Sequence, residues 1–220
     1  MMKDAHFYFL PHDKLGDLFA LIGKAHRIVG PTVSQQAIVY ADIESPEELP
    51  WGYADEQTPG RYHLVKTASR HAFGWVNGPQ AIKPTLFKSS ESLWRVERDK
   101  DGVLKFASVT PAPEKVALFG VRPCDLAAMA IQDKVFIESE FEDARYKIRR
   151  ENLFIVVANC TRSSNNCFCV SAGGSPRAKK QFDLALTELD AGFIVESGSA
   201  PAEEMIVALK LKAAGKKQSQ

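Results

Sequence analysis

The sequence predicts a mixed α/β fold: an open sheet with a parallel βαβ core and an N-terminal mixed lobe. Two apolar runs, 116–122 and 152–159, predict strands, because continuous apolar and β-branched runs are typical of strands covered on both faces. A helical stretch at 124–136 lies between them, so the segment has the order and length of a βαβ unit. Such units are nearly always right-handed and place their two strands parallel in one sheet.

The N-terminal part begins with a helix and a hairpin. Apolar residues recur at helical spacing within 12–25, at Leu15, Leu18, Phe19 and Ile22. The runs 27–33 and 37–43 are separated by three polar residues and predict a β-hairpin.

The segments between this hairpin and the βαβ unit are less regular. Residues 44–62 are rich in proline, glycine and acids, which predicts a loop, and 62–66 predicts a short strand. Glycine and proline interrupt 72–87 too often for a long element. Alternation of apolar and polar residues predicts a strand at 103–109.

The end of the chain predicts a hairpin and a helix. A charged connection at 138–150 joins the two core strands, and the runs 182–189 and 192–197 form a hairpin about Asp190. A closing helix at about 201–214 follows.

We expect the chain to have three parts, and these parts could also form one integrated domain. They are a mixed α/β lobe (1–105), a βαβ core that contains all four cysteines (106–200), and a C-terminal helix with a basic tail (201–220).

The composition is ordinary for a globular protein and excludes some partners. The chain has 220 residues, 45% hydrophobic and 25% charged, with a formal net charge of +1. This balance does not indicate binding to nucleic acid or to a membrane surface. The N-terminal apolar run is about five residues, too short for a secretory signal or a membrane span. We therefore expect a cytoplasmic protein with reduced thiols.

All four cysteines lie within one window of 46 residues, in the pattern C-x35-C-x6-C-x-C. Cys124 and Cys160 each follow the end of a core strand. Because the carboxyl ends of parallel strands meet at one edge of a sheet, we expect these two thiols to lie close together. Cys167 and Cys169 follow on a polar loop, 161–176, that can bring them to the same edge.

The neighbours of the cysteines suggest how a bound group would be supported. Cys124 opens a helix, which predicts a stabilised thiolate with a lowered pKa. Arg122 and Asp125 flank it and can orient the thiolate or balance cluster charge, although such a pair is often merely structural. Phe168, between the last two cysteines, is placed to shield a cluster from water.

From the residues alone, three interpretations of the cysteines stay open. The first is a four-cysteine iron–sulfur cluster, in which the C-x-C thiolates bind separate irons. The second is a structural zinc, which usually uses C-x2–4-C pairs instead. The third is a set of free or redox-active thiols. The spacing matches none of the ferredoxin patterns.

Other motifs carry less information. The sequence has no dinucleotide-binding glycine fingerprint and no P-loop. The loop 78–87 carries Lys83 and is either a proline-rich connector or a contact for a partner or cluster. We expect no histidine to be a ligand; the five are His6, His12, His26, His63 and His71.

Several segments together resemble one family, which unites the β-subunit of cytoplasmic sulfhydrogenases (NiFe hydrogenase and sulfur reductase) with a component of anaerobic sulfite reductase. The resembling segments are 27–33, 37–52, 55–62, 72–80, 118–126, 146–152 and 159–176. The two cysteine-bearing motifs, LFGVRPCDL and NCTRSSNNCFCVSAGGSP, are the most specific.

The resemblance implies that Cys124, Cys160, Cys167 and Cys169 bind a [4Fe–4S] cluster. It also implies electron relay between a catalytic subunit and a flavin- and nicotinamide-binding diaphorase subunit. Other subunits, diaphorase-like or ferredoxin-like, would then be the partners.

The chain departs from this family in one respect. Longer relatives continue into a ferredoxin-like module with two C-x2-C-x2-C-x3-C runs, and these cysteines are absent here. We therefore expect a short, non-catalytic electron-transfer subunit with one cluster. The alternatives are a zinc-stabilised scaffold without a redox role, and an enzyme that uses Cys124 as its nucleophile.

Overall fold

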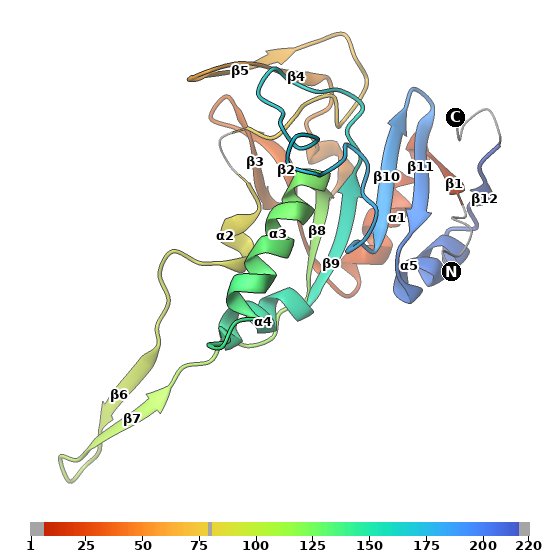
Figure 1. The fold of residues 1–220 in the computed structure, drawn as a ribbon. Helices are drawn as coiled ribbons and strands as arrows, with labels where there is room; N and C mark the ends of the chain where they lie inside the picture. Colours follow the sequence, from red (N-terminus) through yellow and green to blue (C-terminus); the bar gives the residue numbers. More distant parts are fainter. Residues whose placement is uncertain (1–6, 79–80, 216–220) are drawn as a thin grey trace.

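A computed structural model describes residues 7–78 and 81–215. Its centre is an open eight-stranded mixed sheet with helices on both faces, which confirms the predicted mixed α/β class (Figure 1). From one edge to the other, the strands are β12 (Lys212–Ala213), β1 (Phe7–Pro11), β11 (Gly192–Ser197), β10 (Leu184–Leu189), β9 (Leu153–Ala158), β8 (Val116–Val121), β2 (Arg27–Ser34) and β3 (Ala37–Asp42).

The four central strands, β10, β9, β8 and β2, are parallel to one another. β8 and β9 are direct neighbours, with Val116 opposite Leu153, as the βαβ prediction requires. All six residues of β8 are buried. This burial explains why the strand reads as a continuous apolar run rather than an alternating one.

The connection between β8 and β9 contains two helices instead of one. α3 (Pro123–Phe136) was predicted, but α4 (Ala144–Glu151) lies within a segment predicted only as a charged connection. The helix is only eight residues long and five of them are charged, so few apolar residues mark it in the sequence. The Asp143 side chain caps the helix by accepting from the N–H groups of Arg145 and Tyr146, and Tyr146 is fully buried.

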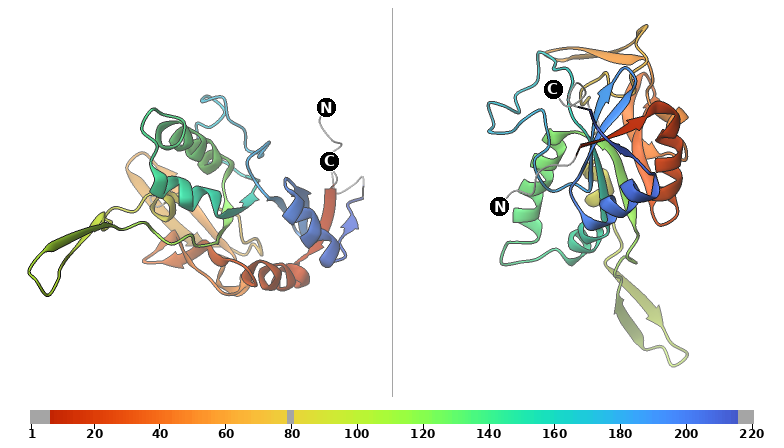
Figure 2. Two further views of the ribbon diagram at one scale, coloured as in Figure 1. Left: turned by 90° about the horizontal axis from the view of Figure 1, so that it is seen from below. Right: turned by 90° about the vertical axis from the view of Figure 1, so that its right-hand side faces the viewer.

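The sheet separates two apolar cores. On one face, α1 (Leu15–Gly23) and α5 (Ala200–Ala208) pack on strand residues that include Phe119 and Val156. On the other, α3, α4 and the short α2 (Lys83–Leu86) pack on their strand neighbours, Leu118 and Val157 among them. Figure 2 shows the sheet between these two helical layers. The four apolar residues predicted for the first helix are all buried.

The predicted loop 44–62 is wrong in part. It contains a 3-10 helix, η2 (Pro46–Glu48), and a strand, β4 (Tyr53–Thr58), which pairs with β5 (Arg61–Lys66) in a separate hairpin. The β4 sequence, YADEQT, is mostly polar and has low strand propensity, so pairing with β5 rather than the sequence itself defines it.

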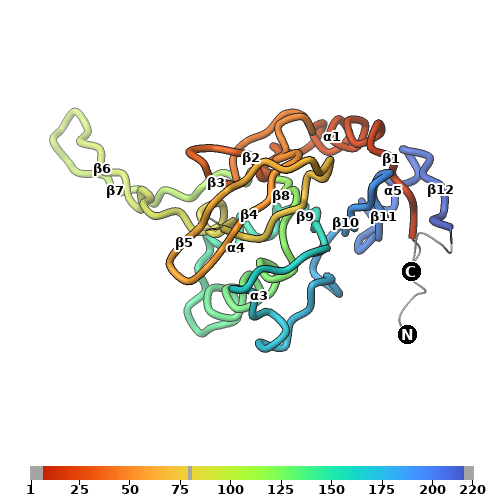
Figure 3. The backbone as a smooth tube through the Cα atoms, turned by 90° about the horizontal axis from the view of Figure 1, so that it is seen from above, coloured from red at the N-terminus to blue at the C-terminus, as the bar shows by residue number. Residues whose placement is uncertain are grey.

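A second separate hairpin joins β6 (Trp94–Arg98) to β7 (Leu104–Ser108). The sequence predicted only the second of these strands. The hairpin projects from the body of the molecule, as the tube view shows clearly (Figure 3). Every residue of both strands is exposed.

The closing helix is shorter than predicted. α5 ends at Ala208, and Lys210 has a positive φ of 52°, which turns the chain toward β12. The three-part division of the chain stays a prediction; the large sheet takes strands from each of the three parts. Within residues 7–78 and 81–215, no helix has the length and apolarity needed to cross a membrane.

Candidate metal centre

All four cysteines line one cavity of about 210 Å³. Cys124 follows β8 and Cys160 follows β9, so the cavity lies at the carboxyl ends of these neighbouring strands. The other lining residues are Gln57, Val76, Asn77, Arg122, Ser164, Asn166, Phe168 and Ser175. None of the four cysteines forms a disulfide. The structure thus brings together the four thiols that the sequence singled out.

The cavity has room for a bound group. It is many times larger than the roughly 10–15 Å³ that a single water needs. In the described part of the chain, no group of three or more His, Cys, Asp or Glu side chains has the arrangement of ligands around one metal ion. Four thiols are the donor set both of an iron–sulfur cluster and of a structural zinc.

The predicted low pKa of Cys124 is wrong for the free thiol. Burial raises its pKa to about 12, and the neighbouring Asp125 and Cys160 add to the rise, although part of the Cys124 surface is exposed. Burial also raises the pKa of Cys160, against the opposing charge of Arg122. For both thiols, the loss of water outweighs the opposing charge of Arg122. An activated nucleophile needs the opposite shift, so these shifts oppose a nucleophilic role for Cys124.

Arg122 is a buried cation on the cavity wall, only 1% exposed. Its guanidinium donates to the carbonyls of Phe73 (3.0 Å), Trp75 (2.5 Å) and Ala158 (3.4 Å), and lies 4.3 Å from the centre of the Trp75 ring. Among the described residues its buried Nε has no hydrogen-bond partner. The hydrogen bonds that the guanidinium makes within this part of the chain go to carbonyls and not to carboxylates.

Asp125 caps the start of α3 and does not pair with the Arg122 side chain. Its Oδ2 accepts from the backbone N–H of Arg122 at 3.0 Å, and its Oδ1 accepts from the Asn77 amide at 2.8 Å. Burial raises the pKa of this carboxyl. The sequence left open whether the Arg122–Asp125 pair orients the thiolate, balances charge or is merely structural. The capping geometry of Asp125 corresponds to a structural role.

Val76 and Asn77 form part of the cavity wall, and buried carboxylates hold their segment, 72–77, in place. Its first two N–H groups donate to the Glu188 carboxylate at 2.7 and 2.8 Å. The N–H of Val76 donates to Asp55 at 2.7 Å. Both acids are nearly inaccessible, at 4% and 1% exposed, and burial raises the pKa of Glu188. Residues from β10 and β4 thus fix this wall.

Arg162 joins the cysteine loop to the same wall. It donates to the carbonyls of Gly74 and Asp55, each at 2.9 Å, and lies 3.5 Å from the Asp55 carboxylate. The loop is anchored at its ends, because the N–H of Cys160 donates to the carbonyl of Pro176 at 2.9 Å.

Two N–H donors point at cysteine sulfur atoms. The Asn77 amide donates to Cys124 Sγ at 3.6 Å, and the backbone N–H of Ser164 donates to Cys167 Sγ at 3.3 Å. The sequence predicted loop N–H donors to sulfur in general terms, but it did not identify Asn77 or Arg162. No sequence signal marks them, since their contacts span 47 to 107 residues along the chain.

The remaining candidates lie outside the cavity or at its rim. Phe168 lines the cavity but is 74% exposed. Lys83 begins α2 and is exposed, with its ammonium 5.8 Å from the Phe87 ring, and it does not line the cavity. None of His12, His26, His63 and His71 lines the cavity, and His6 lies outside the described residues.

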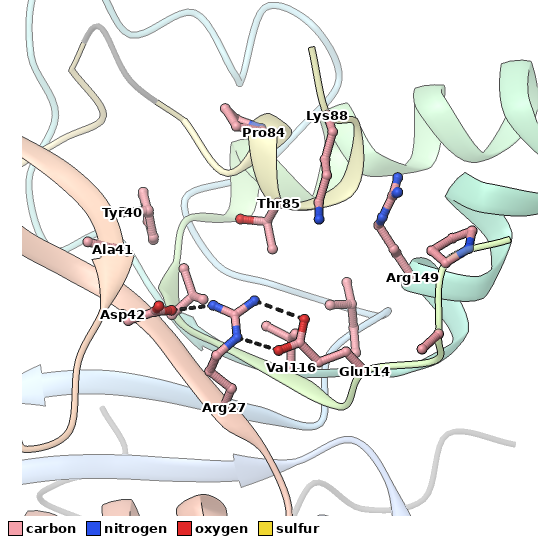
Figure 4. A pocket seen from close by; sticks show the side chains of 14 residues that line it. Arg27, Tyr40, Ala41, Asp42, Pro84, Thr85, Lys88, Glu114, Val116 and Arg149 are labelled. Atoms are coloured by element: carbon pink, nitrogen blue, oxygen red, sulfur yellow. Dashed lines mark hydrogen bonds and ion pairs between the residues drawn. The ribbon is translucent and has the colours of Figure 1, made fainter. Parts of the chain in front are cut away.

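A larger cavity, of about 430 Å³, lies near the amino ends of β8 and β9 (Figure 4). There the Arg27 guanidinium donates to Glu114 at 2.6 and 3.2 Å and also pairs with Asp42. Lys88 points into the cavity. Cysteine and histidine are absent from its lining, so the smaller cavity is the candidate metal centre.

Comparison with known proteins supports one relationship. The chain is 27% identical over 190 residues to Sulfhydrogenase 2 subunit beta from Pyrococcus furiosus. The alignment covers 86% of this chain and 48% of the relative, so the chain spans about half the length of the curated relative. No family model matches the chain, and no solved structure matches it significantly. The chain is therefore related to the sulfhydrogenase beta subunits.

Proposed function

We propose that the chain is an electron-transfer subunit that holds one [4Fe–4S] cluster through Cys124, Cys160, Cys167 and Cys169. The observation that carries the proposal is the cavity these four thiols share at the ends of β8 and β9. When bound, such a cluster supplies one-electron transfer at a potential tuned by its surroundings.

The spacing of the cysteines along the chain favours a cluster over the zinc alternative. Structural zinc sites usually use C-x2–4-C pairs. Here the last two cysteines form C-x-C, and their thiolates can bind separate irons of one cluster.

The charges around the cavity also suit this group. A [4Fe–4S] core with four thiolates is an anion, and the buried guanidinium of Arg122 lines its cavity. The amide of Asn77 and the backbone N–H of Ser164 donate to sulfur. Such donors stabilise negative charge on thiolates and raise the reduction potential. These residues would hold and tune the cluster.

The partners follow from the relationship to a sulfhydrogenase subunit. In our proposal the cluster relays electrons between the catalytic subunit of a hydrogenase, or of a sulfur- or sulfite-reducing complex, and a diaphorase-like or ferredoxin-like subunit. Such a complex would work in the cytoplasm, where thiols stay reduced.

The test is metal analysis of the protein purified without oxygen. We expect about four irons per chain and a broad visible absorbance that dithionite bleaches. Each of the variants Cys124→Ser, Cys160→Ser, Cys167→Ser and Cys169→Ser should lose iron and absorbance. Asn165→Ala is the matched control, because Asn165 is exposed on the same loop and does not line a cavity with the cysteines.

The alternative has a distinct result. A colourless protein with one zinc per chain would refute the electron-transfer proposal and support the scaffold. In that case Cys167→Ser should disorder the loop without changing electron flow.

A further inference from the structure

The hairpin of β6 and β7 forms an arm, here residues 92–109, that extends away from the body (Figures 1 and 2). Arg145 fixes its root, because its guanidinium donates to the carbonyls of Ser92, at 2.9 Å, and Val109. All ten residues of the two strands are exposed. An isolated two-stranded hairpin is marginally stable in water, so this arm is a candidate for pairing with another chain.

The two faces of the arm differ in chemistry. Cross-strand pairing places one set of side chains on the apolar face, and their exposed fractions are large: Trp94 (63%), Val96 (50%), Leu104 (48%) and Phe106 (67%). The opposite face carries Arg95, Glu97 and Lys105, with Glu97 opposite Lys105. In the described part of the chain, no third strand pairs with either edge of the arm.

The exposed edge strand β6, WRVER, is complementary to itself in the antiparallel direction. If two copies pair with Val96 opposite Val96, Arg95 of each copy faces Glu97 of the other. On the apolar face, the same register sets Trp94 opposite Arg98, a favourable cation–π pair. Cross-strand pairs of opposite charge stabilise a sheet, and like charges directly opposite destabilise it.

The charge order also selects one register. A shift to the neighbouring register that preserves the two faces places either Arg95 opposite Arg95 or Glu97 opposite Glu97. Charged residues on an edge strand usually discourage pairing. Here their order permits one alignment and opposes its neighbours.

We propose that two copies of the chain associate through their β6 strands, antiparallel about Val96, to form a four-stranded sheet. On the charged face, Glu97 of one copy then lies between its own Lys105 and Arg95 of the second copy. The charges in this cross-strand row alternate in sign. The apolar face becomes continuous, because Phe106 lies opposite Val96 in each arm and the two Val96 residues meet at the centre.

The shape of the molecule allows this arrangement. Each arm points away from its body, so antiparallel arms place the two bodies at opposite ends (Figure 1). The register brings the tip of each arm, with the exposed Asp101, toward the root of the other arm, where Arg145 lies. The arm precedes β8, whereas the cysteine cavity follows the end of β8, so the association leaves the cavity uncovered.

Sedimentation velocity of the purified full chain over a wide range of concentrations tests the proposal. We expect the unmodified chain to form a dimer. Arg95→Glu and Glu97→Arg should each be monomeric, since each sets like charges opposite one another. An equal mixture of the two variants should form a one-to-one heterodimer, because the acidic strand then faces the basic one.

A single variant could be monomeric merely because the substitution destabilises its own arm. The mixture separates this case, because two destabilised arms would not associate. Lys100→Glu is the matched control, because Lys100 lies exposed in the turn of the arm, outside the paired rows, and this variant should still dimerise. The proposal fails if the unmodified chain stays monomeric, as it would if the arm binds a different subunit. It also fails if either single variant still dimerises or if the mixture does not associate.

Discussion

The side-chain amide of Asn77 donates to the sulfur of Cys124, 3.6 Å away, and to the carboxylate of Asp125, 2.8 Å away. One amide therefore connects the cavity wall to the first turn of α3. Its own carbonyl oxygen is buried and has no hydrogen-bond partner among the described residues.

Replacing Asn77 by leucine should lower the reduction potential of the proposed cluster, because the variant lacks an N–H donor to Cys124. A hydrogen bond worth about 1 kcal/mol corresponds to roughly 40 mV for one electron. Redox titration monitored by electron paramagnetic resonance measures the shift. Asn165→Leu is the control, since Asn165 is exposed on the cysteine loop and does not line the cavity. Equal potentials in the two variants would show that Asn77 does not tune the site.

Replacing Arg122 by methionine should destabilise the protein by about 3 kcal/mol or more. The change leaves buried carbonyls without a donor, and each such loss costs roughly 1–3 kcal/mol. Arg122→Lys keeps the charge but not the planar fork, so its loss should be smaller. Urea denaturation under anaerobic conditions gives the free energies of unfolding. A methionine variant as stable as the unmodified chain would contradict the role of the guanidinium as a link between segments.

The lowered pKa of His12 should make the protein less stable at low pH. Burial, with a smaller contribution from His71, lowers the His12 pKa from its ordinary 6.5. Below pH 6.5 the unfolded chain takes up the proton before the native state does. The stability that comes with a neutral, buried His12 is therefore fully present above pH 6.5. It is lost as the pH falls toward the lower pKa of the native state.

The variant His12→Phe should remove that loss. The ring centre of His12 lies 5.6 Å from that of Trp51 and 5.2 Å from that of Phe193, and phenylalanine can preserve these contacts. Thermal unfolding at about pH 7.5 and 5.5 should show a smaller drop for His12→Phe than for the unmodified chain. His63→Phe, at an exposed position, should leave the drop unchanged. The prediction would be refuted if the drop in thermal stability became smaller in His63→Phe and stayed unchanged in His12→Phe.

Gly174 allows a test of the cysteine loop. A Cβ at this position would lie 2.9 Å from the carbonyl oxygen of Cys169, and the Gly174 N–H donates to the same oxygen. Gly174→Ala should therefore displace Cys169 and reduce the iron bound per chain, with little effect on the melting temperature of the body.

The contrasting substitution is Gly16→Ala in α1, where no atom lies within 4 Å of the added Cβ. It should stabilise the protein by about 0.5–1 kcal/mol and leave the iron content unchanged. Full iron occupancy in Gly174→Ala would show that the loop tolerates the shift.

The parallel core was predictable because its signals are local. Buried strands such as β8 read as apolar runs, and a cysteine at the end of each run places the two thiols at one sheet edge. The elements that the sequence missed depend on distant partners. β4 is a polar strand that exists through pairing with β5, and α4 is a polar helix that is fixed by the burial of Tyr146.

The support of the candidate site was not predictable for the same reason. Asn77 and Arg162 occur in glycine-containing segments that give no periodic signal. Their roles come from contacts with residues far along the chain. The pKa of Cys124 was wrongly predicted because the helix start is visible in the sequence, whereas the burial that raises the pKa is visible only in the fold.

In the proposed function, the fixed wall of segment 72–77 would affect the rate of electron transfer. Backbone dipoles that are already bonded to Glu188, Asp55, Arg122 and Arg162 have little freedom to turn when the charge of a nearby group changes by one electron. Preorganised dipoles cost little rearrangement at the moment of reaction. A small reorganisation energy means a low activation barrier, so a cluster held against this wall would exchange electrons quickly even with a modest driving force.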